Sequence, residues 1–161
     1  MKRNEFISGR LKEVLIDGKW IANTNYKDQL ENLDWSQATE KNGNLNSIAS
    51  ITYHVTYYLK GFVTLFESGH LDIRDKYSFD MQPITCESDW KSLLTDFIDN
   101  SNKIIEHIRQ LNEDKLEDIF VEEKYGTYHR NLEGMIEHCY YHLGQITLLK
   151  KMILDKDKKD I

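Results

Sequence analysis

Apolar residues recur at helical spacing in four long segments of the chain. The first extends from about residue 4 to residue 17, the second from 46 or 47 to 68, the third from just after Ser88 to about 111, and the fourth from about 131 to 154. Within each segment the apolar side chains fall three or four positions apart, which places them on one face of a helix. We therefore predict four amphipathic helices.

Residues at the ends of these segments support the prediction. Asn46 or Ser47 is a suitable N-cap for the second helix, and Gly69 suits its C-terminus. Between the first and second helices the spacing is less regular. We expect the larger apolar side chains of that stretch to pack across the end of the bundle: Trp20, Ile21, Tyr26, Leu30, Leu33 and Trp35.

The fold class that follows is all-α, with the four helices arranged as a bundle. Residues 1–161 give room for one domain with a full hydrophobic core, and hardly for two. The longest connection falls between the second and third helices, from Gly69 to Glu87, and it contains Pro83, the one proline of the chain.

Composition and charge exclude several classes of function. With 21 basic and 27 acidic residues the formal charge is −6, which argues against general binding to nucleic acid or anionic lipid. No apolar run reaches the length of roughly 20 residues that a membrane span needs. The first 15 residues lack the apolar stretch of a signal peptide, and Cys86 and Cys139 form no C-x-x-C pair. We expect a cytoplasmic protein with reduced thiols.

Three of the six histidines fall on predicted inward faces. His138 and His142 are four residues apart, so their side chains project from the same face of the last helix, beside Gln145. His54 follows Ile51 on the inward stripe of the second helix. We expect the other three histidines to be solvated on the surface: His70, His107 and His129.

Metal coordination is the chemistry that suits this arrangement. An i, i+4 histidine pair can share one ion, and a third imidazole from another helix leaves at least one coordination position open. The alternative is that each inward histidine is a hydrogen-bonded core residue. Cys139 stands where the helical motif of the zinc proteases has glutamate, so their general base is missing here.

Two segments carry a resemblance to a known family. EHCYYHLGQI (137–146) is similar to the last-helix signature of the DinB-like family of bacterial metal-binding four-helix bundles, and SIASITYHVTYYLKGF (47–62) resembles that family's second helix. Two further segments show a weaker similarity to the family, LDWSQAT (33–39) and YGTYHRNLEGM (125–135). The resemblance implies an up-down bundle with a long connection between the second and third helices.

Carried over residue by residue, the family's three metal ligands fall on His54, His138 and His142. The resemblance implies one divalent ion, with Zn or Ni favoured over Fe or Mn, although imidazole suits all four. We expect an open site walled by aromatic side chains, with Tyr57, Tyr58 and Trp20 as candidates.

The function that the resemblance implies is a metal-dependent transferase that acts with a low-molecular-weight thiol. A metal-dependent hydrolase and a non-catalytic metal-binding or stress-response protein are the alternatives. No catalytic residue is assigned, because Glu133 and Glu137 are close to the histidines in sequence but Glu137 points about 100° away from His138. The expected partner is a small-molecule substrate, with no nucleic acid and no membrane. A homodimer is compatible with the aromatic faces, but no dedicated interface can be read.

Overall fold

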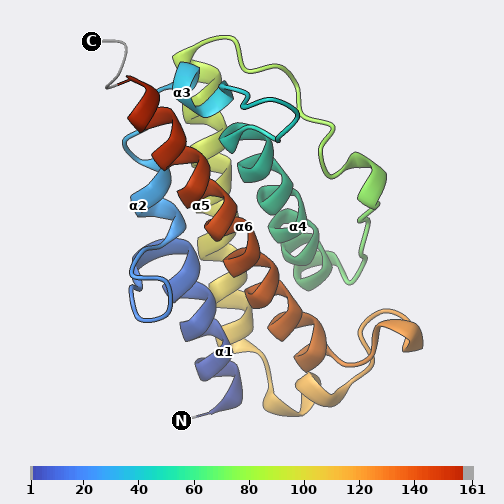
Figure 1. The fold of residues 1–161 in the computed structure, drawn as a ribbon. Coiled ribbons are helices and arrows are strands. Elements are labelled where there is room, and N and C mark those ends of the chain that lie inside the picture. The colour runs from blue at the N-terminus through green and yellow to red at the C-terminus, as the bar shows by residue number, and fades with distance from the viewer. Residues whose placement is uncertain (1, 158–161) are drawn as a thin grey trace.

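Four long helical segments form the body of the protein, whose structure is a computed structural model that describes residues 2–157 (Figure 1). The all-α prediction is confirmed, since within that range the one extended pairing is an isolated bridge between Ile119 and Thr127. No helix of residues 2–157 has both the length and the apolar character that a membrane span requires. The long segments are α1 (Arg3–Lys12), α4 (Ile48–Ser68), α5 (Glu87–Gln110) and α6 (Tyr128–Asp157).

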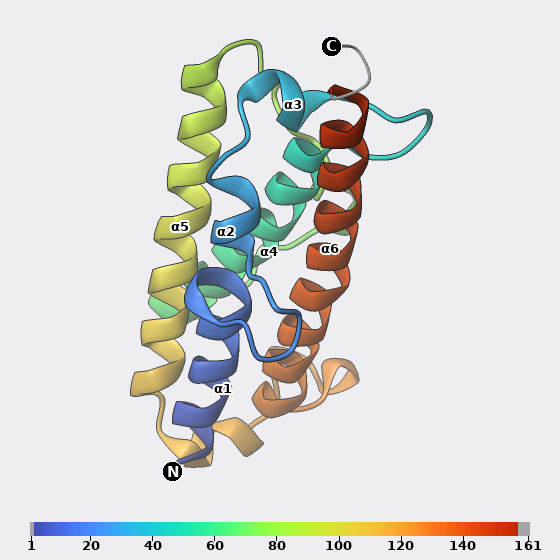
Figure 2. The ribbon, with the colours of Figure 1, turned by 60° about the vertical axis from the view of Figure 1, so that its left-hand side comes forward.

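Six short elements complete the structure. A π-helical turn, η1 (Glu13–Asp17), continues α1, and the other five are the short helices α2 and α3 and three 3₁₀ turns in the connections before and after α5. Their bounds are α2 (Tyr26–Leu30), α3 (Trp35–Thr39) and the 3₁₀ turns η2 (Asp75–Tyr77), η3 (Glu113–Glu117) and η4 (Glu123–Tyr125). Figure 2 shows α1, α2 and α3 following one another along the bundle, between α5 and α6.

The stretch between α1 and α4 differs from its prediction. It forms α2 and α3 along the side of the bundle rather than an irregular cap across its end. Tyr26, Leu30 and Leu33 are buried as expected, but Trp20 is 87% exposed and Ile21 is 59% exposed. Both lie in the loop that joins η1 to α2, where no helix covers them.

The long connection between α4 and α5 runs back along α4. The Tyr57 hydroxyl donates to the Arg74 carbonyl at 3.2 Å, and the Tyr58 hydroxyl donates to Asp75 at 2.8 Å. The chain therefore returns to the end of the bundle where α4 began, and α4 and α5 point the same way (Figure 1). The alternation of a simple up-down bundle is interrupted at this connection.

The last helix, α6, runs antiparallel to α4. Phe66, near the C-terminus of α4, lies 6.1 Å from Tyr128 at the start of α6, measured between ring centroids. Ile51, near the start of α4, shares a surface hollow with Leu149, near the end of α6. This pairing places the middle of α4 beside the middle of α6.

The core is apolar and tied together by two buried side-chain hydrogen bonds. The Trp90 indole donates to the Leu33 carbonyl at 2.8 Å, and the Tyr26 hydroxyl donates to the Cys139 carbonyl at 2.8 Å. These bonds fix the segment after α1 to α5 and α6. The helical spacing of the first segment places Phe6 on the same apolar stripe as Ile7 and Leu11, but this part of the prediction is wrong, since Phe6 is 48% exposed in α1.

Both predicted ends of α4 are confirmed. The Ser47 hydroxyl accepts a hydrogen bond from the Ser50 backbone N–H at 3.2 Å. Gly69 adopts φ +75°, and its N–H donates to the Leu65 carbonyl at 2.8 Å. Left-handed backbone of this kind is inexpensive for glycine, because other residues have a Cβ that meets the following carbonyl.

We expect the same substitution to have opposite effects at two glycines. Gly69→Ala should lower the free energy of unfolding by about 1 kcal/mol, since alanine is strained at positive φ. Gly144→Ala, on an exposed position inside α6 where a Cβ meets no atom within 4 Å, should raise it by roughly 0.5–1 kcal/mol. Urea unfolding of both variants measures the difference, and a loss of equal size at both positions would contradict this account of the α4 terminus.

Candidate metal centre

Three histidine side chains meet between α4 and α6. His54 comes from α4, and His138 and His142 come from α6 one turn apart. One ring nitrogen of each lies within 4.8 Å of the others. The Nε2 atom of His138 is 3.0 Å from that of His54 and 3.0 Å from that of His142. The structure thus brings together the three residues that helical spacing selects.

The antiparallel packing of α4 and α6 explains this convergence. His54 lies in the middle of the inward stripe of α4, between the buried residues Ile51 and Val55. His138 and His142 face it from the middle of α6. His54 and His142 are each 7% exposed, whereas His138 is half-buried. Solvent therefore approaches the cluster on the side of His138.

The hydrogen bond of His142 with Gln145 fixes where its lone pair points. The Gln145 Oε1 atom is an acceptor and lies 2.7 Å from His142 Nδ1, so Nδ1 carries the proton. The lone pair of His142 is then on Nε2 and faces His138. A ligating histidine whose other nitrogen donates to a protein oxygen is the usual arrangement at metal sites.

The His138 ring cannot satisfy both of its neighbours. A neutral imidazole nitrogen has either one proton or one lone pair, so His138 Nε2 can complete one full hydrogen bond while it faces two Nε2 atoms at 3.0 Å. A single cation placed among the three nitrogens would accept all three lone pairs. The donor set therefore fits a metal ion better than it fits a hydrogen-bonded core cluster.

Aromatic side chains hold the His54 ring in place. Phe79, from the long connection, stacks on it with ring centroids 4.1 Å apart and planes at 14°. Tyr58 meets it edge-on, with centroids 5.0 Å apart. The Nε2 atom of His54 faces the other imidazoles, 3.0 Å from His138 Nε2, and its Nδ1 is buried without a hydrogen bond of full geometry.

All three imidazoles are neutral at neutral pH. Burial lowers the pKa of His54 to about 4, with a further contribution from His142, while the Ser78 backbone and Asp75 oppose the shift. Burial and the two neighbouring histidines lower the pKa of His138 to about 4. Burial also lowers the pKa of His142, and Gln145 opposes the change. The lone pairs are therefore available to a metal without the removal of protons.

Cys139 and the two neighbouring glutamates stand apart from the cluster. Cys139 is fully buried on the side of α6 that faces Tyr26, and burial raises the pKa of its thiol to about 12. Glu133 forms an ion pair with Arg10 at 2.7 Å, and Glu137 is exposed. Among residues 2–157 no cysteine or carboxylate joins the three histidines as a fourth candidate ligand.

The remaining histidines lie elsewhere. His70 is exposed as predicted. The surface prediction is wrong in part for His107 and His129, which are half-buried. His107 stacks on Phe66 with centroids 5.7 Å apart and lies 3.6 Å from a Glu67 oxygen, and His129 is in the first turn of α6.

Only one of the three aromatic candidates lines a pocket at the cluster. Tyr58 borders a pocket of about 350 Å³ that opens onto His138. Tyr57 turns its hydroxyl to the Arg74 backbone, and Trp20 is exposed beside Glu13, so neither forms a wall of this pocket. No pattern in the sequence indicates that Phe79 contacts His54, because Phe79 belongs to a non-helical segment. The contact of His142 with Gln145 could have been predicted from their i, i+3 spacing.

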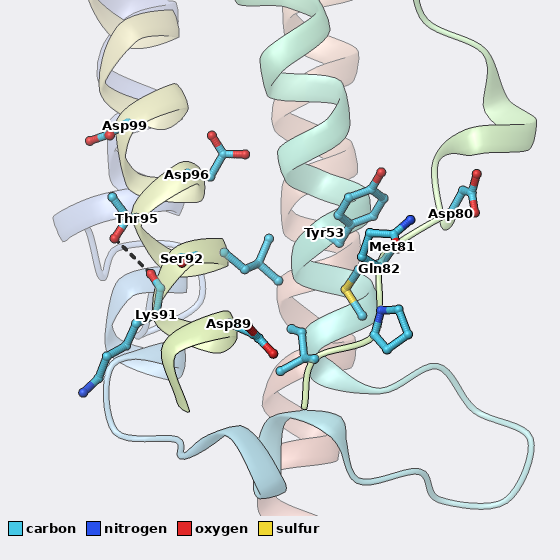
Figure 3. A pocket seen from close by; sticks show the side chains of 13 residues that line it. Tyr53, Asp80, Met81, Gln82, Asp89, Lys91, Ser92, Thr95, Asp96 and Asp99 are labelled. Carbon is cyan, nitrogen blue, oxygen red and sulfur yellow. Dashed lines mark hydrogen bonds between the residues drawn. The ribbon is translucent and has the colours of Figure 1, made fainter. Parts of the chain in front are cut away.

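A larger hollow of about 880 Å³ lies between α4, α5 and the long connection (Figure 3). Tyr53 and Met81 border it on one side, and Asp89 and Asp96 on the α5 side. These two carboxylates accept hydrogen bonds from neighbouring residues, Asp89 from Thr85 and Asp96 from Asn100. No histidine lines the hollow, so it is separate from the cluster.

The comparisons with known proteins agree with the site. Neither the comparison with curated proteins nor that with solved structures gave a match. The sequence model of the DinB superfamily, however, matches residues 23–146, which is most of the chain and includes all three histidines. The chain belongs to the DinB superfamily.

Proposed function

We propose that His54, His138 and His142 bind one divalent metal ion and that the protein is a metal-dependent transferase acting with a low-molecular-weight thiol. The observation that carries the proposal is the convergence of three neutral Nε2 atoms beside a pocket, with no fourth candidate ligand in the described chain. Three protein ligands leave a position open for an exogenous group, as in catalytic rather than structural sites. Zn and Ni are the preferred ions.

The metal would supply Lewis acidity, which lowers the pKa of a thiol or water molecule at the open position. The chain supplies the orientation of the ligands. Gln145 holds the proton of His142 on Nδ1, and Phe79 and Tyr58 hold the plane of the His54 ring. The three ligand nitrogens are thus held facing one another before any ion binds.

No carboxylate of residues 2–157 joins the three histidines, which favours thiol transfer over hydrolysis. Hydrolysis of an amide or alkyl ester needs a group that protonates the departing atom. Tyr58 lines the pocket, but its hydroxyl proton is donated to Asp75 at 2.8 Å. Asp75 is exposed, and the two glutamates of α6 stand apart from the cluster. In thiol transfer the sulfur gives up its proton to solvent, its electron pair forms a bond to an electrophilic carbon, and the leaving group departs with the electrons of the broken bond.

We expect the purified protein to bind one equivalent of Zn²⁺ or Ni²⁺ and to melt at a higher temperature with the ion than after chelation. His54→Ala, His138→Ala and His142→Ala should each weaken binding by at least an order of magnitude, because each removes one of three ligands. Elemental analysis and calorimetry measure both effects. His70→Ala is the matched control, since His70 is exposed and lies outside the cluster, and this change should leave the stoichiometry of metal binding unchanged. Equal metal content in His70→Ala and His138→Ala would refute the assignment.

The metal-free protein should lose stability on mild acidification. An unfolded histidine titrates near 6.5, whereas the pKa of His54 and of His138 is about 4 in the folded chain. Between these values the unfolded state binds more protons, so the free energy of unfolding should fall as the pH is lowered from 6.5 toward 4. Urea unfolding across this range measures the slope. His138→Gln, which removes one titrating group, should give a shallower slope than the native sequence.

The transferase proposal predicts metal-dependent conjugation. Metal-loaded protein should join a cysteine-derived thiol to a model electrophile, and thiol binding should release a proton and strengthen as the pH approaches the pKa of the free thiol. His142→Ala should abolish both. Equal rates with loaded and stripped protein would reject the proposal. Ester or amide cleavage without thiol would support a hydrolase instead, and inactivity in both assays a non-catalytic metal-binding protein.

A further inference from the structure

We propose that the pocket beside His138 is a binding site for the carboxylate end of the substrate, with Arg130 as the residue that recognises it. This inference rests on the proposed function and adds a substrate class: molecules with a metal-binding head and a carboxylate at the opposite end. Arg130 is a specificity-determining residue in this account and takes no part in the bond-forming step.

The pocket has a different chemical character at each end. It has a volume of about 350 Å³ and lies between α4 and α6. His138 is at one end, and Arg130 and Asn131 are at the other, two turns earlier on α6. Eight residues of helix separate Arg130 from His138, which corresponds to about 12 Å along the axis. A ligand that reaches from the metal position to Arg130 therefore has a backbone of about ten atoms or a compact branched equivalent.

The walls between the two ends are mainly apolar. The rings of Phe62 and Tyr58 form the α4 side, and Met135 and Gly134 form the α6 side. Phe62 is 7% exposed and Met135 is 5% exposed, so both are held by the core. No Asp or Glu lines the pocket. A carboxylate that enters it meets a cation at the far end and no competing negative charge on the walls.

Arg130 is the unusual arginine of this chain. Each of the other four arginines has a carboxylate oxygen within 4 Å: Arg3 with Glu117, Arg10 with Glu133, Arg74 with Asp72 and Arg109 with Glu106. Arg130 has no such partner among residues 2–157, although acidic residues outnumber basic ones. An unpaired guanidinium at the end of a pocket offers a planar set of donors that matches a carboxylate.

Gly126 determines where the Arg130 side chain lies. A Cβ at Gly126 would stand 3.0 Å from Arg130 Cδ, so the aliphatic part of Arg130 passes over this glycine. Gly126 also has φ +74°, which disfavours other residues. The turn between η4 and α6 therefore leaves room for the aliphatic part of Arg130 beside Gly126, at the end of the pocket far from His138, where the residue is exposed and accessible to a ligand.

The test uses two matched series of probes with metal-loaded protein. Each mercaptocarboxylic acid, HS–(CH₂)n–COO⁻, is paired with the mercaptoalcohol of the same chain length, and calorimetry gives both dissociation constants. We expect the acid to bind about tenfold more tightly than the alcohol once the chain is long enough to reach Arg130, and equally at short lengths. Arg130→Gln should remove the preference, and Arg130→Lys should retain part of it.

Lys124→Gln is the control for general electrostatics. It removes the same charge from η4, close to Arg130, but Lys124 is exposed and does not line the pocket. The acid preference should survive this change. A preference that falls equally in Lys124→Gln and Arg130→Gln, or that is the same at every chain length, would overturn the proposal. Unchanged metal content and helicity of Arg130→Gln would show that the loss is local.

A second series keeps the outcome separate from that of thiol transfer. Hydroxamates bind metal ions through oxygen, so a carboxylate-ended hydroxamate and its alcohol-ended partner test Arg130 without any sulfur chemistry. If thiols fail to bind while the hydroxamate pair still shows an Arg130-dependent preference, the transferase proposal fails and the carboxylate site stands. If thiols bind and neither series shows the preference, the carboxylate site fails and the transferase proposal stands.

Discussion

The packing of α4 against α6 is the interaction on which the functional part of this molecule depends. Each helix places imidazole rings in the middle of a stripe that is otherwise apolar, and burial keeps those rings uncharged. Buried polar groups without full hydrogen-bond partners are costly, so the cluster lowers the stability of the fold, and the surrounding apolar contacts offset this loss. A bound cation would remove that cost, which connects the stability of this interface with its occupancy.

The long connection between α4 and α5 has two roles that follow from its path. It returns the chain to the other end of the bundle, and on the way it supports the cluster. Ile73 lies so close to Gly61 that a Cβ there would stand 2.4 Å from it, and Phe79 covers His54. Tyr58 links the two parts, because its ring touches His54 and His138 while its hydroxyl holds Asp75. A segment that looks like a linker in the sequence thus helps to orient the His54 ring.

Periodicity and end signals predicted much of this structure. Ser47 and Gly69 fixed the bounds of α4 because capping is a local property, and His54, His138 and His142 followed from the faces of two long helices. The elements α2 and α3 escaped prediction because five residues are too few to show a helical period. Phe6 and Trp20 were misplaced since an apolar side chain at a rim or in a loop has the same sequence signal as one in the core. The positions of Phe79 and Arg130 could not be predicted from the sequence, because they depend on which segments become neighbours in the folded chain.

The low proton affinity of the three imidazoles has a consequence for how the site fills. Histidines that carry protons must release them before they can bind an ion. Metal binding by such histidines depends on the pH and releases protons into the solution. Here the pKa of His54 and of His138 is about 4, so both rings are unprotonated well below neutrality, and burial lowers the pKa of His142 as well. The three imidazoles would therefore release no protons to the buffer if an ion bound at neutral pH, and a proton released on binding would come from the water or thiol at the open position. Occupancy of a metal at these histidines would then depend on the concentration of free ion and little on small changes of pH near neutrality.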